Sequence, residues 1–154
     1  MIRIRKILYS TDFSPYSNQA YFHAIALAEK HGASLTILYV YVPGVTVPGR
    51  PDSSSRAYWQ EQLESIRPVD PGIPVHHVLL DGDAATEIVR YAHDAGMDLI
   101  VMGTHGRTGL ERLLMGSVTE KVMRESPCSV MVVKLPRGIT LPEKSDVAVV
   151  ASPA

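Results

Sequence analysis

The chain alternates short apolar runs with segments whose apolar residues recur at helical spacing. The apolar runs cover about residues 4–10, 34–42, 75–80, 99–102 and 128–133. The second of these runs is almost continuously apolar, which is typical of a parallel strand covered on both faces. Because a helical segment separates each run from the next, the order predicts an α/β domain with one parallel sheet, right-handed crossovers and helices on both faces.

The residues that flank the helical segments predict where the helices begin and end. Ser14 and Pro15 suit the N-cap and the first position of a helix that Gly32 ends. The other helices are expected at about 56–66, from the Asp83 cap to Gly96, and at about 117–125. The last of them opens on Ser117-Val118-Thr119-Glu120, which fits a capping box in which the serine hydroxyl accepts from the Glu120 N–H.

Two further stretches bear on function. Residues 43–55 are rich in Pro, Gly and Ser and have no apolar period, so they predict a loop that is mobile or acts as a flap. His76 and His77 are adjacent on a predicted strand and therefore point to opposite faces of the sheet. A regular strand cannot bring both rings to one metal ion, so we interpret the pair as structural.

The composition is that of an ordinary globular domain. With 154 residues, 45% hydrophobic and 20% charged, the chain suits one domain with a single core. A formal net charge of −1 gives no support to binding of nucleic acid or of an anionic membrane through bulk electrostatics. No apolar run reaches the roughly 20 residues of a membrane helix, and the N-terminus lacks the apolar region of a signal peptide. The single cysteine, Cys128, excludes an internal disulfide, and we expect it to be buried and inert in a cytoplasmic protein.

Residues 101–117, VMGTHGRTGLERLLMGS, carry the strongest functional signal. They run from an apolar strand through a loop containing Gly103, Gly106 and Gly116 to the start of a helix. A backbone without Cβ atoms lets phosphate oxygens approach N–H groups, and a helix N-terminus favours negative charge. The stretch matches neither the dinucleotide fingerprint GxGxxG nor a Walker-type loop. Taken alone, the glycines fit either a tight turn or a phosphate-binding loop.

The fuller spacing decides between these two interpretations. Gly103, two residues, Gly106, nine residues and then Gly116-Ser117 resembles the motif G-x2-G-x9-G-[ST] of the ATP-binding branch of the universal stress protein family. The resemblance extends over about residues 4–134 and implies an open, doubly wound, five-stranded parallel sheet of order 3-2-1-4-5, of the adenine nucleotide alpha hydrolase-like kind. It makes residues 1–134 the nucleotide-binding domain and 135–154 a C-terminal tail, which either dangles or adds residues 147–150 to a sheet edge.

The same resemblance implies a binding site at the carboxyl ends of the first and fourth strands, where the strand order reverses. Thr11 and Asp12 follow the first strand, and Asp12 matches the acid that contacts the ribose or adenosine end. The alternative for Asp12 is an Asx turn leading into the Ser14 cap. Val40 matches a position whose backbone reaches the adenine edge, a role compatible with a place in the core. The remaining matches are Met102 and Gly103 beside the ribose, Gly106, Gly116, Ser117, Val118 and Thr119 around the phosphates, and His105 and Arg107 inside the loop.

The resemblance implies a cytoplasmic stress-response protein that binds an adenine nucleotide and signals as a homodimer. ATP is the expected ligand, with AMP and ADP as alternatives and Mg²⁺ held by the phosphates. No catalytic residue and no protein metal ligand is expected, because no acid lies between Val101 and Leu110. A slow ATPase and a dimerisation module without nucleotide are the competing hypotheses. Dimerisation is expected through Cys128–Val133, with an unidentified protein as a further partner and no contact with nucleic acid or membrane.

Overall fold

The computed structural model describes residues 1–104 and 115–134. Its elements are β1 (Lys6–Ser10), α1 (Pro15–His31), β2 (Ser34–Tyr41), η1 (Pro51–Ser54), α2 (Arg56–Glu64), β3 (Val75–Asp81), α3 (Ala84–Asp94), β4 (Leu99–Gly103), α4 (Ser117–Glu125) and β5 (Ser129–Val133). The predicted strands and helices therefore exist, with ends displaced by one or two residues. The predictions for His105, Gly106, Arg107 and the tail 135–154 lie outside the described residues.

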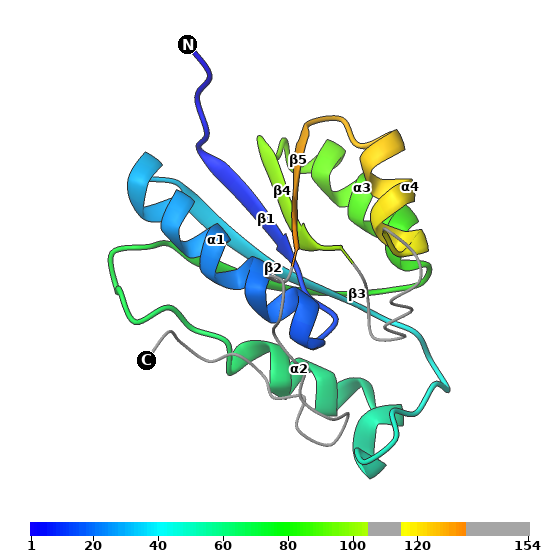
Figure 1. Ribbon diagram of the computed structural model, residues 1–154. Helices are drawn as coiled ribbons and strands as arrows, with labels where there is room; N and C mark the ends of the chain where they lie inside the picture. Colours follow the sequence, from blue (N-terminus) through cyan, green and yellow to red (C-terminus); the bar gives the residue numbers. More distant parts are fainter. Residues whose placement is uncertain (105–114, 135–154) are drawn as a thin grey trace.

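The strands form one parallel sheet in the order β3-β2-β1-β4-β5, as the resemblance implied. Figure 1 shows α1 and α2 on one face of this sheet and α3 and α4 on the other. The central strand β1 pairs with β2 on one side and β4 on the other, and in that register Tyr9 lies beside Val101. The strand order thus reverses between β1 and β4, so that their carboxyl ends lie side by side.

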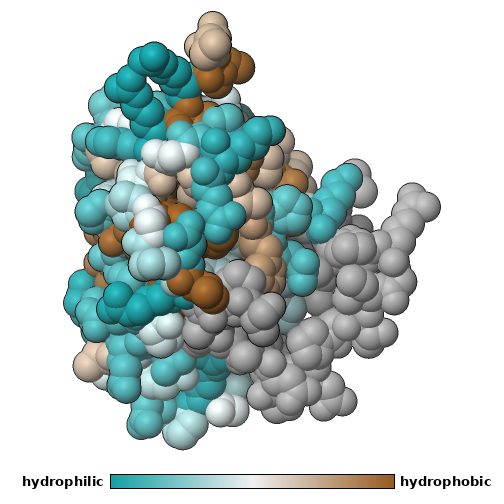
Figure 2. Space-filling model, turned by 90° about the vertical axis from the view of Figure 1, so that its left-hand side faces the viewer, coloured by the Kyte–Doolittle hydropathy of each residue, from teal (hydrophilic) through white to brown (hydrophobic). Residues whose placement is uncertain are grey.

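Successive side chains of β1 point to opposite faces of the sheet, and each face has its own hydrophobic core. Ile7 and Tyr9 belong to the core under α1 and α2, while Leu8 belongs to the core under α3 and α4. All three side chains are fully buried, as expected for the middle strand of a sheet that is covered on both faces. The face in Figure 2 is mostly hydrophilic, with hydrophobic residues in small groups. No helix within residues 1–104 and 115–134 is both long and apolar enough to cross a membrane.

The ends of α1 follow the predicted chemistry. The Ser14 hydroxyl accepts from Ser17 N at 3.3 Å, Pro15 begins the helix, and Gly32 ends it with φ of 62°. The buried side of the helix includes the alanines Ala20, Ala24 and Ala28, all at most 1% exposed. These small side chains let the helix backbone lie close to the sheet.

The loop predicted at 43–55 has more structure than its composition suggested. It contains η1, and the Ser53 hydroxyl, buried within that turn, accepts from Val47 N at 2.6 Å. The Trp59 indole N–H donates to the Ser53 carbonyl at 2.6 Å, and the Tyr41 hydroxyl donates to the Ser54 carbonyl at 2.5 Å. These partners come from β2 and α2, outside the segment itself, so its own composition did not indicate the turn.

The two adjacent histidines point to different environments. His76 is exposed, whereas His77 is partly buried with its Nε2 2.7 Å from the Ile66 carbonyl oxygen. The contact of His77 joins β3 to the chain that follows α2. This is the structural role predicted for that ring.

Candidate functional site

A cavity of about 280 Å³ opens at the carboxyl ends of β1, β2 and β4, and we call it the strand-end pocket. Nine of the residues predicted from the sequence line it: Thr11, Asp12, Val40, Met102, Gly103, Gly116, Ser117, Val118 and Thr119. The fold therefore brings residues from four separate segments to one place. Six residues outside the predicted set also line the pocket: Ser10, Ser17, Tyr39, Val42, Ala84 and Ile88. Of these, Ala84 and Ile88 lie one helical turn apart at the start of α3, a spacing that could have indicated them.

Hydroxyl groups build the turn between β1 and α1 that forms one wall of the pocket. Thr11 Oγ1 accepts from Phe13 N at 3.0 Å and lies 3.2 Å from Ser17 Oγ, which donates to the Ser14 carbonyl at 2.9 Å. The Tyr9 hydroxyl donates to the Ser17 carbonyl at 2.7 Å. Burial raises the pKa of Tyr9, so the phenol stays protonated and remains a donor. Thr11 is 3% exposed, and its hydroxyl serves this turn.

Asp12 forms the Asx turn that was the alternative to a ligand role. Its Oδ1 accepts from Ser14 N at 2.9 Å, which places the carboxylate at the entrance to α1. The side chain is only partly buried and also lines the pocket. The turn fixes the position of the carboxylate beside the cavity, so the two roles are compatible.

Gly103 is a glycine for a reason that the sequence did not show. A Cβ at this position would lie 2.7 Å from the Tyr16 carbonyl oxygen and 3.1 Å from Ser17 N. Backbone atoms cannot yield as a flexible side chain can, so the first turn of α1 requires a residue without a side chain here. The expected reason, close approach of phosphate, is not needed to explain this glycine.

The start of α4 differs from the capping box predicted there. Gly116, not Ser117, is the N-cap, with φ of −72° and ψ of 162°, and Glu120 N donates to the Gly116 carbonyl at 3.0 Å. The physical reason is the hydrogen bond from Gly116 N to the Thr104 carbonyl at 2.7 Å. It holds Gly116 at the entrance to the helix, so the N-cap lies one residue before the predicted one. Ser117 is exposed as the first helical residue, and the prediction that it caps the helix is wrong.

A glycine N-cap leaves α4 without a side-chain acceptor at its first turn. Ser14, Ser55 and Asp83 supply such an acceptor to α1, α2 and α3, respectively. The first N–H groups of a helix have no intrahelical partner and carry the positive end of the helix dipole. An anion in the strand-end pocket can satisfy donors that Gly116 cannot.

Thr119 joins two walls of the pocket. Its Oγ1, in the first turn of α4, donates to the Gly103 carbonyl at 2.8 Å, and the residue is 3% exposed. The end of β4 is further tied to β5 by the hydrogen bond from Thr104 N to the Val133 carbonyl at 3.2 Å. The wall that carries the uncapped helix start is therefore fixed to the sheet.

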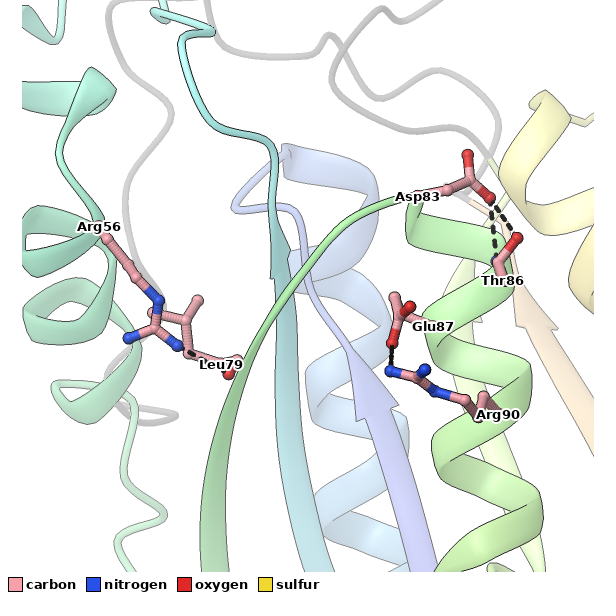
Figure 3. A network of polar contacts seen from close by, with 6 residues as sticks. All are labelled: Arg56, Leu79, Asp83, Thr86, Glu87 and Arg90. Carbon is pink, nitrogen blue, oxygen red and sulfur yellow. Dashed lines mark hydrogen bonds and ion pairs between the residues drawn. The ribbon is translucent and has the colours of Figure 1, made fainter.

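Charged groups hold the neighbouring helix starts in place, as Figure 3 shows for α3. Asp83 caps α3, and hydrogen bonds from the side chain and then the backbone of Thr86 lower the pKa of its carboxyl. Lys121 of α4 lies 3.7 Å from Asp83 and donates to Thr86 at 3.1 Å. The ammonium group of Lys121 therefore joins α4 to α3.

Two further ion pairs lie near these starts. Glu87 accepts from Arg90 within α3, and Arg56 at the start of α2 donates to the Leu79 carbonyl at 3.2 Å and to Asp81 at 3.0 Å. The contacts of Arg56 join the start of α2 to β3. Among residues 1–104 and 115–134, no group of three or more His, Cys, Asp or Glu side chains is arranged to hold a metal ion.

Comparisons with known proteins agree with this architecture. A model of the universal stress protein family matches residues 3–134. Universal stress protein MJ0531 of Methanocaldococcus jannaschii is 38% identical over 142 residues, which cover 86% of this chain and 84% of that protein. The solved structure of MJ0577 from the same organism has a TM-score of 0.69 at 30% identity and covers 89% of this chain and 100% of that chain.

A more distant likeness concerns the fold. A universal stress protein solved in complex with cAMP has a TM-score of 0.61 at 21% identity, with 84% of this chain and 96% of that chain covered. The family match reaches from before β1 to after β5 and so includes every described element of the sheet. The chain belongs to the universal stress protein family.

Proposed function

We propose that the strand-end pocket binds an adenine nucleotide, with ATP as the preferred ligand and AMP or ADP as alternatives. The observation that carries the proposal is the start of α4, a helix N-terminus without a side-chain cap that faces the same cavity as Asp12. Such a helix start favours the negative charge of phosphate. The occupied and empty states would then differ in how α4 is capped, which suits a regulatory protein of the stress response.

The lining of the pocket offers suitable groups for each part of a nucleotide. Asp12 supplies a carboxylate that can accept from the two hydroxyls of a ribose. Val40, Ile88 and Met102 supply apolar contacts between which a base can be removed from water. At the other end, the first turn of α4 supplies N–H groups for phosphate. His105, Gly106 and Arg107, outside the described residues, remain predicted phosphate contacts.

The residues around the pocket support binding without efficient hydrolysis. Asp12 is the only acid among the described lining residues, and its Oδ1 already accepts from Ser14 N. Hydrolysis needs a group that positions water and usually a carboxylate that holds Mg²⁺. We therefore propose that Mg²⁺ is held by the phosphates and that turnover is at most slow.

A homodimer through Cys128–Val133 is part of the proposal. Within the described residues β5 pairs with β4 alone and is the last strand of the sheet. Its side chains at Val130, Met131 and Val132 are only partly buried. An apolar strand with one unpaired edge is an aggregation hazard unless something covers it, and a second copy would do so. We also propose that residues 1–134 form the nucleotide-binding domain, that 135–154 form its tail, and that the protein acts in the cytoplasm.

Titration calorimetry with ATP, ADP, AMP and GTP tests the binding proposal. A saturating adenine nucleotide at 100 times its Kd should stabilise the fold by about 2.7 kcal/mol, and GTP should stabilise it less. A melting curve that no adenine nucleotide moves would favour a dimerisation module without nucleotide. In a single-turnover assay at saturating protein, rapid conversion of ATP to ADP would favour an ATPase. Mass spectrometry of the ligand retained by native protein identifies the adenylate directly.

A further inference from the structure

Phe13 has a backbone conformation that its residue type disfavours. Its φ is 62°, and it is the only described residue other than glycine with a positive φ. A bulky side chain in this left-handed region is strained, and such strain persists only where the surroundings hold the residue in place. Phe13 directly follows Asp12, the carboxylate at the pocket.

An aromatic cluster holds Phe13. Its ring, 1% exposed, lies with its centroid 5.0 Å from that of Tyr39 in an edge-on arrangement and 5.0 Å from that of Trp59 in a stacked one. Trp59 is itself fixed, because its indole donates to the Ser53 carbonyl at 2.6 Å and the Arg50 guanidinium carbon lies 5.7 Å from its ring centroid. The ring of Phe13 is thus clamped by residues of β2 and α2.

The clamp determines the path of the chain on both sides of Phe13. Phe13 N donates to Thr11 Oγ1 at 3.0 Å, and Ser14 N donates to Asp12 Oδ1 at 2.9 Å. The second of these hydrogen bonds spans Phe13, so the backbone conformation of Phe13 determines whether Ser14 N reaches Asp12 Oδ1. If the ring were released, the strain would favour another backbone conformation, and the Asp12 carboxylate would lose its fixed position.

We propose that Phe13, clamped by Tyr39 and Trp59, is a positioning residue that holds Asp12 in the geometry that recognises the ribose hydroxyls. The inference rests on the proposed function of the same pocket and adds to it a residue that does not line the cavity. It also gives α2 and η1 a role in ribose selectivity, because the clamp depends on Trp59. If Phe13 only stabilised the fold, replacing it would lower stability and weaken the binding of all ligands by the same factor.

Ribose selectivity separates the two roles. The measurement is the Kd of ATP and of 2′,3′-dideoxy-ATP by calorimetry for the wild type, Phe13→Leu and Asp12→Asn. Hydrogen bonds to a charged carboxylate should make the wild type prefer ATP by about tenfold or more. In Phe13→Leu this preference should fall to within about threefold, while the affinity for the dideoxy compound changes little.

Two variants of α2 extend the test if Phe13→Leu folds poorly. Trp59→Phe keeps an aromatic ring against Phe13 and should retain the preference, whereas Trp59→Ala should lose it. Leu63→Ala is the matched control, because Leu63 is fully buried on the same helix but has no ring. It should lower the melting temperature and leave the preference intact.

Each result supports the inference or overturns it. If Asp12→Asn removes the preference and Phe13→Leu and Trp59→Ala keep it, Asp12 contacts the ribose and Phe13 does not position it; the proposed function then stands alone. If Leu63→Ala removes the preference as fully as Phe13→Leu does, the effect is general destabilisation and the inference fails. If the wild type binds both nucleotides equally, the ribose contact and the inference fail together while nucleotide binding stands, and only the absence of binding overturns the proposed function.

Discussion

The sharpest test of the phosphate end is the substitution Gly116→Asp. Gly116 has φ of −72° and ψ of 162°, close to the −83° and 160° of Ser14, which caps α1 with its side chain. An aspartate in this conformation can accept from the first-turn N–H groups of α4 in place of a phosphate. The variant should therefore fold at least as well as the wild type, with a gain of a few tenths of a kcal/mol, about the difference between aspartate and glycine at an N-cap.

Nucleotide affinity should change far more than stability. Two unit charges 4 Å apart interact with about 4 kcal/mol at the effective dielectric of a protein surface, so the new carboxylate should repel the phosphates strongly. Allowing for screening and readjustment, we expect ATP to bind about 100-fold more weakly, which corresponds to about 2.7 kcal/mol. Gly116→Asn is the matched control, because asparagine caps as well as aspartate but carries no charge. Its loss of affinity should be clearly smaller.

The assay is titration calorimetry with ATP and with adenosine, alongside a thermal melt of each variant. Adenosine has no phosphate, so its affinity should be the same in all three proteins. If ATP binds to Gly116→Asp as to the wild type, the phosphates do not lie at the start of α4 and the reasoning fails. Equal losses for ATP and adenosine would instead indicate general damage to the pocket.

Three further predictions concern packing, pH and assembly. Gly103→Ala should destabilise the fold by about 1–3 kcal/mol in urea unfolding, because its Cβ would lie 2.7 Å from the Tyr16 carbonyl oxygen; an unchanged midpoint would contradict the close approach. Asp83→Ala should cost about 1 kcal/mol at pH 7 through the lost cap of α3. Because the folded-state pKa of Asp83 is lowered, its ionised form contributes stability above the unfolded pKa, and the difference between wild type and variant should shrink as the pH falls through the folded value; a difference that grows in acid would contradict this sign. Val132→Lys should convert a dimer to a monomer in sedimentation at about 10 μM by placing charge on β5; an unchanged dimer would argue against this interface.

The sequence predicted the features that local chemistry decides. Ser14, Pro15 and Gly32 set the ends of α1 because caps and left-handed glycines act over a few residues. The almost unbroken apolar run of β2 likewise indicated a strand covered on both faces. The strand order, and with it the meeting of Asp12 and Gly116 at one pocket, came from the family resemblance and not from periodicity.

The features that were missed depend on partners distant in sequence. The N-cap of α4 moved to Gly116 because of a hydrogen bond to Thr104, on the other side of the glycine-rich stretch. A glycine is required at position 103, at the end of β4, because a Cβ there would clash with the backbone of Tyr16 in α1. Phe13 carries no local signal for its positive φ, and its ring packs against Tyr39 and Trp59, which lie far along the chain. In each case tertiary contact determines a backbone conformation that composition cannot indicate.

Gly103 connects the two ends of the proposed site. On one side its missing Cβ admits the backbone of Tyr16 in the first turn of α1, the helix that follows Asp12. On the other its carbonyl accepts from Thr119 at 2.8 Å in the first turn of α4. The groups proposed to bind ribose and phosphate are therefore fixed to the same residue of β4. Fixing both in advance lowers the ordering cost of binding, because these two walls need not be assembled around the ligand.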